Sequence, residues 1–425
     1  MKICMMGLGY IGLPTAVMFA QHDIDVHGVD INEELVKKIN KKELTIQEPG
    51  LYEKMCNVIE NGRFTASTSP TNADVFIIAV PTPITSDKKA DLSFVYAAVR
   101  MILPYLESGR LVVVESTVPP RTIEDKIIPI LSESRLEVGK DLLVSHSPER
   151  VLPGKLIEEL IWNDRIVGGI NEESCLRTVF LYKHFVKGNI YMTDARTAEM
   201  VKLIENTYRD VNIALANEFA EIGEKLELNI MEAITLANYH PRVNIHAPGP
   251  GVGGHCIAVD PYFIIEQAPE ESKLITLARN INEKAPYRIV SLIEKSVENI
   301  NNPVITLLGL AYKGNTSDLR ESPSLVILEE LEKKGYQVKL HDPHTCEFFP
   351  GKSNTIEESV KDTDCLVILN DHNEYKSFNF QTLKNLFHTR NIIDTKNILN
   401  HQTLREHGFN CIQIGTPFKI NNNWR

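Results

Sequence analysis

The sequence predicts an α/β protein in which two doubly wound, Rossmann-like domains are joined by a helical central domain with a long helix. Two observations support this prediction. Short β-branched runs alternate with helical patterns in the first and the last part of the chain, and a long helical pattern without proline lies between them. Alternation of strands and helices is typical of a parallel sheet that helices cover on both faces.

The expected elements define three domains. A length of 425 residues suits two or three domains at about 150 residues each. We expect a first domain over residues 1–194, a central helical domain over 195–302 and a second α/β domain over 303–425. The expected strands are residues 3–6, 25–29, 75–80, 111–115, 142–145, 304–309, 337–340, 365–369 and 391–394. The expected long helices cover 195 to about 236 and 272 to about 298.

The composition excludes several functional classes. No apolar run reaches the roughly 18 residues that cross a bilayer, and the N-terminal MKICMMGLGY has no signal-peptide cleavage region, so we expect a cytoplasmic protein without a membrane partner. The net charge of −11 and the lack of a basic run argue against nucleic acid. The seven scattered cysteines contain no CxxC pair, which argues against both a disulfide framework and a metal site.

The first chemical motif is Gly7-Leu8-Gly9-Tyr10-Ile11-Gly12, between an expected strand and an expected helix. Glycines in this arrangement allow a tight turn and let the backbone approach a pyrophosphate at a helix N-terminus. Asp30 ends the next strand, 18 residues after Gly12, close to the spacing for ribose recognition. No arginine follows it, so NAD is favoured over NADP, although an aspartate after a strand can also be a simple cap.

Three further strand ends carry polar residues. Thr82 and Thr117 lie in the segments VPTP and ESTVPP, and Glu149 lies in SPERVLPGK. Ligands of doubly wound sheets bind at the carboxyl ends of the strands, so these side chains are expected near the cofactor and its nicotinamide. The alternative is that threonine and proline only terminate the strands.

Two features of the central part point to catalysis. Lys202, Asn206 and Arg209 share one face of a helix, where they could hold a hydroxyl and its alkoxide, although a solvated polar stripe is the more common explanation. The segment 240–260 is too rich in glycine and proline for a helix or a central strand, so it is a shaped loop. It ends at Cys256 and is followed by Asp260, and a cysteine presented in this way can act as a nucleophile.

In the last part, LAYKG follows a strand and DLRESP begins a helix. This placement is typical of a second ligand site, with Lys313 available to a phosphate or a sugar hydroxyl.

Together these motifs resemble one family across nearly the entire chain. In order, they are GLGYIG, VPTP, ESTVPP, SPERVLPGK, KLIENTYRD, HPRVN, GPGVGGHCIAVDP and LAYKGNTSDLRESP. The chain resembles the UDP-glucose/GDP-mannose dehydrogenase family, and its cysteine loop is most similar to members that oxidise UDP-N-acetyl-D-mannosamine. UDP-N-acetylglucosamine and UDP-glucose remain alternative substrates.

The resemblance implies a set of site residues. The positions that match NAD contacts are Tyr10, Ile11, Asp30, Thr82, Thr117 and Arg320, with Glu149 near the reacting carbon. The positions that match nucleotide-sugar contacts are Arg150, Val151, Lys202, Asn206, Arg209, Gly253, Tyr312 and Lys313. His240 and Arg242 correspond to residues that family members contribute from a neighbouring subunit, so a homodimer is implied.

The resemblance also implies a four-electron oxidation of a C6 alcohol to a carboxylate, which supplies precursors for polysaccharide synthesis. Cys256 would form a thiohemiacetal and then a thioester, Lys202 and Asn206 would stabilise oxyanions, and Glu149 or Asp260 would activate water. Two other classes remain open. A two-electron hydroxyacid-type dehydrogenase and a non-catalytic sensor of NAD or nucleotide sugars would both have no use for Cys256.

Overall fold

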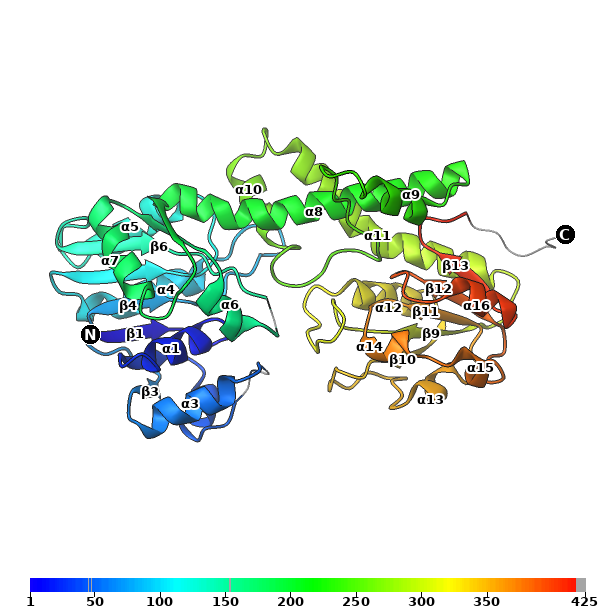
Figure 1. Ribbon diagram of the computed structural model, residues 1–425, viewed down its shortest axis with the longest axis horizontal. Coiled ribbons are helices and arrows are strands. Elements are labelled where there is room, and N and C mark those ends of the chain that lie inside the picture. Colours follow the sequence, from blue (N-terminus) through cyan, green and yellow to red (C-terminus); the bar gives the residue numbers. More distant parts are fainter. Residues whose placement is uncertain (45, 47, 153, 418–425) are drawn as a thin grey trace. The chain divides into compact units, whose positions relative to one another are not determined.

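The structure is a computed structural model that describes residues 1–44, 46, 48–152 and 154–417. These residues pack into two compact units, each built around its own largely parallel sheet (Figure 1). The first unit comprises Met1–Glu205 and Tyr262–Pro269, and the second comprises Asn206–Pro261 and the residues from Glu270 onward. The unit boundaries divide the expected central domain, so the expected boundaries at residues 194 and 302 stay a prediction.

The first sheet has eight strands in the order β3-β2-β1-β4-β5-β6-β7-β8, and all neighbours are parallel except β6 and β7. The strands are β1 (Lys2–Met6), β2 (Asp25–Val29), β3 (Phe64–Ser67), β4 (Val75–Ile78), β5 (Arg110–Val114), β6 (Leu142–His146), β7 (Arg165–Gly169) and β8 (Ile190–Asp194). The helices are α1 (Gly12–Ala20), α2 (Glu33–Asn40), α3 (Leu51–Glu60), α4 (Ser93–Ile102), α5 (Ile128–Ser132), α6 (Leu156–Trp162) and α7 (Glu172–Tyr182), with short helical segments at Leu103–Tyr105 and Ile123–Ile127.

The second sheet has five parallel strands in the order β10-β9-β11-β12-β13. The strands are β9 (Val304–Leu308), β10 (Gln337–His341), β11 (Cys365–Ile368), β12 (Asn391–Asp394) and β13 (Asn410–Gln413). The later helices are α8 (Ala195–Leu226), α9 (Ile230–Ala237), α10 (Asp260–Gln267), α11 (Lys273–Val297), α12 (Pro323–Lys333), α13 (Ile356–Val360), α14 (Asn373–Lys376), α15 (Phe380–Leu383) and α16 (His401–Glu406). None of the described helices is both long and apolar enough to cross a membrane.

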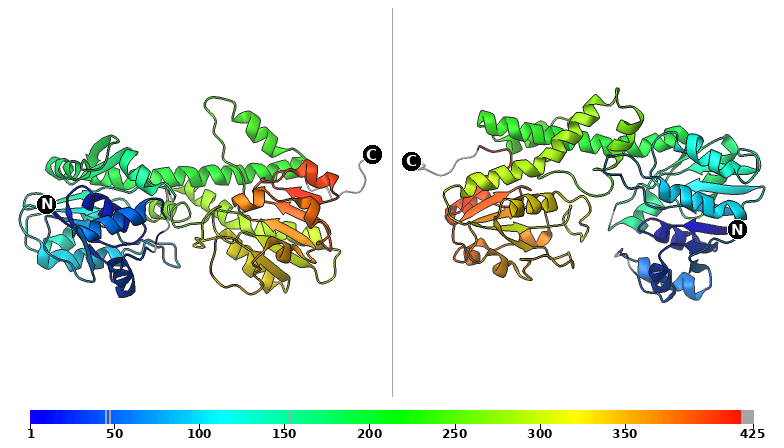
Figure 2. Two further views of the ribbon diagram at one scale, coloured as in Figure 1. Left: turned by 60° about the horizontal axis from the view of Figure 1, so that its bottom comes forward. Right: turned by 180° about the vertical axis from the view of Figure 1, so that it is seen from behind.

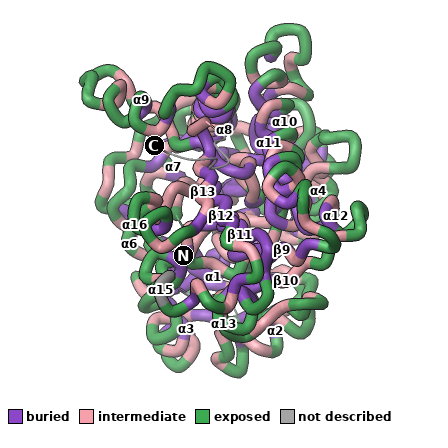
Figure 3. The backbone as a smooth tube through the Cα atoms, turned by 90° about the vertical axis from the view of Figure 1, so that its right-hand side faces the viewer, coloured by how far each residue is buried: buried purple, intermediate pink, exposed green. Residues whose placement is uncertain are grey.

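Alternate residues along each strand build a core on each face of the sheet. On β1, Ile3 and Met5 pack with α1, α3 and α7, whereas Cys4 and Met6 pack with α4 and α5. The second sheet has the same arrangement, with α11 and α12 on one face and α13 to α16 on the other. Figure 3 shows the strands of the second sheet among the buried parts of the chain. The doubly wound fold class is confirmed in both units.

The nine expected strands are present, but the expected helix from 195 to about 236 is interrupted. α8 ends at Leu226, Glu227 has a left-handed φ of 57°, and the Leu228 amide donates to the Gly223 carbonyl at 2.8 Å. This is a Schellman-type helix end. The Asn229 side chain then accepts from the Glu232 amide and caps α9, a separate helix in Figure 2. The expected long helix is therefore confirmed as α8, and the helical pattern continues to about residue 236 in α9, after a break that local capping produces.

Candidate active site

The turn after β1 has the conformation that the glycine motif predicts. Gly7 has a φ of 96°, a left-handed value that favours glycine. A Cβ on Gly7 would lie 2.4 Å from the Ala79 carbonyl oxygen, and a Cβ on Gly12 would lie 2.0 Å from the Gly7 carbonyl oxygen. A Cβ on Gly9 would meet nothing within 4 Å, so this side of the turn is open. The turn therefore brings bare backbone and the N-terminus of α1 to a position where an anion can bind.

Asp30 closes this turn from the end of β2. Its Oδ2 accepts from the Leu8 amide at 2.9 Å, and its Oδ1 accepts from the Asn32 amide at 2.9 Å. An ionised carboxylate has about four acceptor positions, so each oxygen keeps capacity for a ribose hydroxyl. The open turn and this carboxylate fit the pyrophosphate and the adenosine ribose of NAD. Tyr10 and Ile11 lie in the same turn and are half-buried.

Thr82, Thr117 and Glu149 lie beyond three neighbouring parallel strands, β4, β5 and β6. The carboxyl ends of parallel strands meet at one edge of a sheet, so these residues share the edge that carries the glycine turn. Ser116 links two of the ends, because its hydroxyl donates to the Val80 carbonyl at 2.7 Å and accepts from the Val80 amide at 2.9 Å. Their cofactor contacts stay a prediction that this position supports.

Glu149 is held by backbone and by charge. Its Oε1 accepts from the Arg150 amide at 2.7 Å, and its Oε2 forms an ion pair with Arg165. The Arg150 guanidinium pairs in turn with Glu205 at 2.8 Å. Val151 packs against the core of the first unit. The start of the SPERVLPGK segment is therefore a fixed platform at the sheet edge.

The polar face predicted on α8 is divided by the unit boundary. Lys202 lies in the first unit and is half-buried, whereas Asn206 and Arg209 lie in the second. Asn206 is 1% exposed, its Nδ2 donates to Asp260, and its Oδ1 accepts from Arg209. Both ends of the amide are bound, so its orientation is fixed. At Asn206 the face is a buried network and not a solvated stripe.

Cys256 ends the glycine-rich loop and starts the turn into α10. Its carbonyl oxygen accepts from the Asp260 amide at 2.8 Å, so the thiol and the Asp260 carboxylate are carried by one turn. The Gly249 amide donates to the Asn217 side chain at 2.9 Å, which anchors the loop to α8. The loop is thus fixed within the second unit.

Two glycines before Cys256 allow close packing on Tyr312. A Cβ on Gly253 would lie 2.7 Å from the Tyr312 Cβ, and one on Gly254 would lie 2.7 Å from the Tyr312 ring. The Gly254 amide also donates to the Arg320 carbonyl at 3.0 Å. A larger residue at either position would push the loop away from the strand end of β9, which carries Tyr312.

Charged groups surround this loop. Asp318 binds the Arg320 guanidinium at 2.6 Å and lies 3.7 Å from His255 Nδ1. Burial raises the pKa of Tyr312, the charges of Asp318 and Cys256 raise it further, and Arg320 opposes the rise. The structure therefore places Arg320 beside the cysteine loop, in the second unit, whereas the other predicted cofactor residues lie in the first.

The second unit repeats the glycine turn of the first. Residues 309–314 read GLAYKG, against GLGYIG at residues 7–12. Gly309 has a φ of 95°. Its amide donates to the carbonyl of His341, the last residue of β10, at 2.9 Å. The Gly7 amide donates in the same way to the carbonyl of Val29, the last residue of β2, at 2.8 Å. The Leu310 amide donates to Asp342 at 2.7 Å, as the Leu8 amide does to Asp30.

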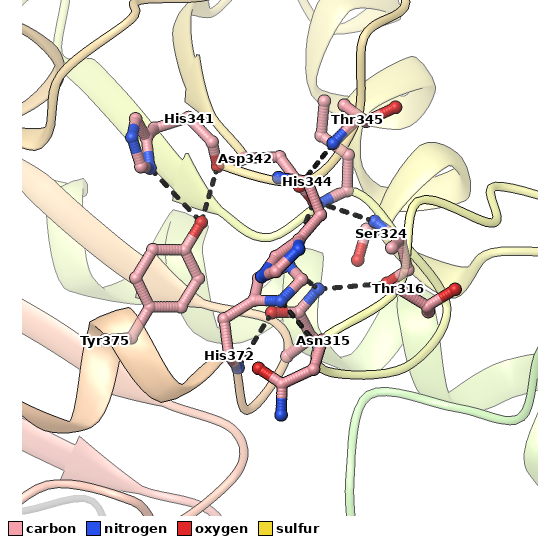
Figure 4. A network of polar contacts seen from close by, with 12 residues as sticks. Asn315, Thr316, Ser324, His341, Asp342, His344, Thr345, His372 and Tyr375 are labelled. Atoms are coloured by element: carbon pink, nitrogen blue, oxygen red, sulfur yellow. Dashed lines mark hydrogen bonds and ion pairs between the residues drawn. The ribbon is translucent and has the colours of Figure 1, made fainter. Parts of the chain in front are cut away.

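The carboxylates of Asp30 and Asp342 differ in how many hydrogen-bond acceptor positions they have free for a ligand. Asp342 is buried, and its oxygens accept from the amides of Leu310, Ala311, His344 and Thr345 and pair with His372 (Figure 4). These contacts fill its acceptor positions, and hydrogen bonds from His372 and these amides lower the pKa of Asp342 despite its burial. The second turn is therefore closed to a ribose, and Lys313 is exposed where the first turn has Ile11.

His344, His372 and Glu374 bring possible metal-ligand atoms within 4.8 Å of one another. His372 Nδ1 accepts from the Asn315 amide at 2.8 Å, so its proton is on Nε2, which faces Asp342 at 3.2 Å. Neither ring nitrogen has a lone pair free for a cation. We assign no metal to this group.

The structure adds residues that the sequence did not reveal. Arg165 pairs with Glu149, Glu48 accepts from Tyr10 and from the Gly154 amide, and Asn217 holds the cysteine loop. Their partners are 16 to 106 residues away in the sequence, so no local motif could have indicated them. His240 and Arg242, in contrast, are exposed near the end of α9.

The glycine turn, its ribose carboxylate and a polar sheet edge define a class, the Rossmann-fold dehydrogenases that use a dinucleotide. Comparison with known protein families identifies one family within this class. Models of the UDP-glucose/GDP-mannose dehydrogenase family match the chain over residues 1–186 (NAD binding domain), 196–284 (central domain) and 306–401 (UDP binding domain). The chain belongs to this family, which indicates NAD as its cofactor.

Relatives span almost the whole chain. The UDP-N-acetyl-D-mannosamine dehydrogenase of Methanococcus vannielii is 48% identical, with 97% of each chain covered. A solved structure of a UDP-D-ManNAc dehydrogenase from Pyrococcus horikoshii has a TM-score of 0.92 at 42% identity and covers 98% of this chain and 99% of its own. The UDP-N-acetyl-mannosamine dehydrogenase Cap5O from Staphylococcus aureus has a TM-score of 0.90 at 43% identity, with 98% and 99% covered.

Replacement of each of the two equivalent aspartates by alanine is expected to change a different property of the protein. Asp30→Ala should weaken NAD binding by about ten-fold or more, because ribose hydrogen bonds to a charged group are lost. Asp342→Ala should leave NAD affinity within about two-fold, yet lower the free energy of unfolding by roughly 2 kcal/mol or more, because it leaves buried amides without acceptors. Calorimetric titration and urea unfolding measure both. Equal NAD affinities in the two variants would contradict this assignment.

Proposed function

We propose that the chain is an NAD-dependent UDP-sugar 6-dehydrogenase that oxidises the C6 alcohol of UDP-N-acetyl-D-mannosamine to a carboxylate. The observation that carries the proposal is the fixed cysteine loop, which packs on Tyr312 through Gly253 and Gly254 and carries Cys256 on the same turn as Asp260. A dehydrogenase that stops at an aldehyde or a ketone has no need for such a thiol. Lys202 and Asn206, four residues apart on α8, supply the polar groups beside the reacting carbon.

The first oxidation needs a base and a fixed alcohol. Two NAD molecules, bound at the glycine turn one after the other, would each supply the hydride acceptor for one of the two oxidations. Lys202 takes the proton of the C6 hydroxyl and stabilises the alkoxide that develops, and the second N–H of the Asn206 amide donates to the same oxygen. The contacts of Asn206 with Asp260 and Arg209 keep that N–H aligned.

The second oxidation needs a tetrahedral carbon that still carries hydrogen. The Cys256 thiolate adds to the C6 aldehyde, and the carbonyl oxygen becomes an alkoxide that Lys202 and Asn206 stabilise. Loss of hydride from this thiohemiacetal leaves a thioester. A water that Glu149 or Asp260 deprotonates attacks the thioester and the C–S bond breaks. The Cys256 thiolate is regenerated and the carboxylate product leaves. Glu149 suits this task because both its oxygens are held and acceptor positions remain.

The remaining parts of the site follow the family resemblance. Arg150, Val151, Arg209, Gly253, Tyr312 and Lys313 are assigned to the nucleotide sugar, and Tyr10, Ile11, Thr82, Thr117 and Arg320 to NAD. The choice of N-acetylmannosamine rests on the names of the most similar relatives, and UDP-N-acetylglucosamine and UDP-glucose are the competing substrates.

Seven free cysteines, with no disulfide among the described residues, support a cytoplasmic location.

We also propose a homodimer formed along α8. Tyr208, Leu215, Ile222 and Leu226 are 56%, 38%, 42% and 60% exposed. Their spacing of seven, seven and four residues puts them on one face of the helix. An exposed apolar stripe of this kind marks a protein interface. Exposed His240 and Arg242 are then available to the neighbouring subunit's site.

The decisive assay counts NADH formed per sugar consumed. Two NADH per sugar are expected, because the aldehyde is oxidised again after Cys256 adds to it. Cys256→Ala should abolish acid formation while NAD affinity stays within about two-fold, and Cys411→Ala is the matched control. One NADH per sugar would support a two-electron dehydrogenase, and none would support a sensor. The same assay with the three UDP-sugars tests the substrate.

The dimer can be tested by substitution and by mixing. Leu215→Glu combined with Ile222→Glu should give a monomer in light scattering, whereas Leu176→Glu, at another exposed leucine, should not. If Arg242 completes the neighbour's site, mixing inactive Cys256→Ala and Arg242→Ala subunits should restore about a quarter of wild-type activity by random assortment. A mixture that stays inactive after exchange of subunits would contradict the shared site.

A further inference from the structure

A buried cluster behind Glu149 contains two carboxylates and one guanidinium. Arg165, on β7, pairs with Glu149 and also lies 3.3 Å from Glu115 Oε1 at the end of β5. The side chains of Arg165, Glu115 and Glu149 are 5%, 0% and 9% exposed. If both carboxylates were ionised, the cluster would hold one uncompensated negative charge away from water, which is costly.

The hydrogen bonds indicate which carboxylate is neutral. Glu149 is bound at both oxygens, by the Arg150 amide and by Arg165. Glu115 has one bound oxygen, Oε1, which accepts from the Tyr182 hydroxyl at 2.5 Å, while its Oε2 is buried without a hydrogen-bond partner. A carboxylate oxygen in that position is poorly stabilised, whereas a protonated Glu115 leaves Arg165 and Glu149 as a neutral pair.

The groups that face Glu115 agree with this charge state. From α7, the Tyr182 ring lies under the Arg165 guanidinium at 4.0 Å and its hydroxyl points to Glu115. From the end of β6, the Ser147 hydroxyl accepts from Arg165 at 3.2 Å. Burial raises the pKa of Glu115 to about 7, with Arg165 opposing the rise and Glu149 adding to it. His146 alternates to the opposite face of β6, and burial lowers its pKa to about 3, so it brings no charge.

We propose that Arg165 is the positioning residue for the Glu149 carboxylate, and that Glu115 is a neutral, proton-holding partner that keeps the Arg165 charge available to Glu149. Arg165 is anchored from behind by Tyr182, Ser147 and Glu115, so it can hold Glu149 in one orientation while Glu149 acts on water. This role rests on the proposed function, in which Glu149 serves hydrolysis of the thioester. The charge state of Glu115 does not rest on it.

The charge state is tested by unfolding alone. A folded pKa above the unfolded value gives stability that is present below the unfolded pKa and is lost as pH rises through about 7. Glu115→Gln removes this dependence, so its urea midpoint relative to wild type should rise between pH 5.5 and pH 8.5. Glu173→Gln, at an exposed glutamate of α7, should show no such trend. A Glu115→Gln difference that does not vary with pH would mean that Glu115 is ionised, and would overturn the assignment.

The positioning role is tested in turnover. Glu115→Gln should keep kcat within about three-fold at pH 6.5, since the amide resembles the neutral acid. Adding Arg165→Gln to this variant removes the guanidinium without leaving two buried carboxylates, and kcat should fall by about a hundred-fold with NAD affinity unchanged. Arg165→Lys in the same background should recover part of the loss, because its charge still reaches Glu149.

Two further readouts separate positioning from structure. The Arg165→Gln double variant should accumulate enzyme-bound acyl group after a burst of NADH, because hydrolysis is the step that slows. A kcat loss without acyl accumulation, or one that matches the loss of folded protein, would overturn the positioning role. If wild type forms no NADH at all, the proposed function fails, whereas the unfolding experiment still reports on Glu115.

Discussion

Both halves of this molecule depend on one contact, a carboxylate at the end of the second strand that holds the backbone turn after the first strand. Asp30 does this for the Gly7 turn and Asp342 for the Gly309 turn. The contact fixes bare amides at the edge of the sheet, where the ends of the other strands also present their side chains. The two aspartates differ in how many hydrogen-bond acceptor positions remain free. Asp30 keeps acceptor positions for a ribose, whereas the acceptor positions of Asp342 are filled by the turn that carries Tyr312 and Lys313 and by its other neighbours.

The second turn also holds the glycine-rich loop in which the proposed nucleophile lies. Tyr312 forms the surface against which Gly253 and Gly254 pack, and Asn217 holds the other end of the loop. The position of Cys256 is therefore set by the packing of the loop backbone. In the first unit Glu149 lies in a short segment after a strand and is likewise held by a contact from another part of the chain, the ion pair with buried Arg165. Glu149 and the cysteine loop are thus both held by buried or partly buried polar contacts.

The sequence predicted those features of the fold and of the candidate site that depend on residues close together in the chain. Strands such as β1, β4 and β5 were evident because they are continuous apolar runs, and the glycine turn and the cysteine loop have recognisable spacing. β8 was not predicted because most of its residues are exposed, and β7 begins with Arg165 and ends in two glycines. The pairs Glu149–Arg165, Asp342–His372 and Asn217–Gly249 were not predictable, because they depend on how distant segments pack.

The proposed mechanism requires that the Cys256 sulfur becomes covalently bound to C6 during turnover. The most direct measurement is rapid acid quenching of the enzyme with UDP-N-acetyl-D-mannosamine and NAD, followed by mass spectrometry of the peptide that contains Cys256. We expect an acyl group on that cysteine, which forms together with a burst of NADH and is removed by hydroxylamine. A burst of two NADH per site with Cys256 unmodified at every time point would contradict it.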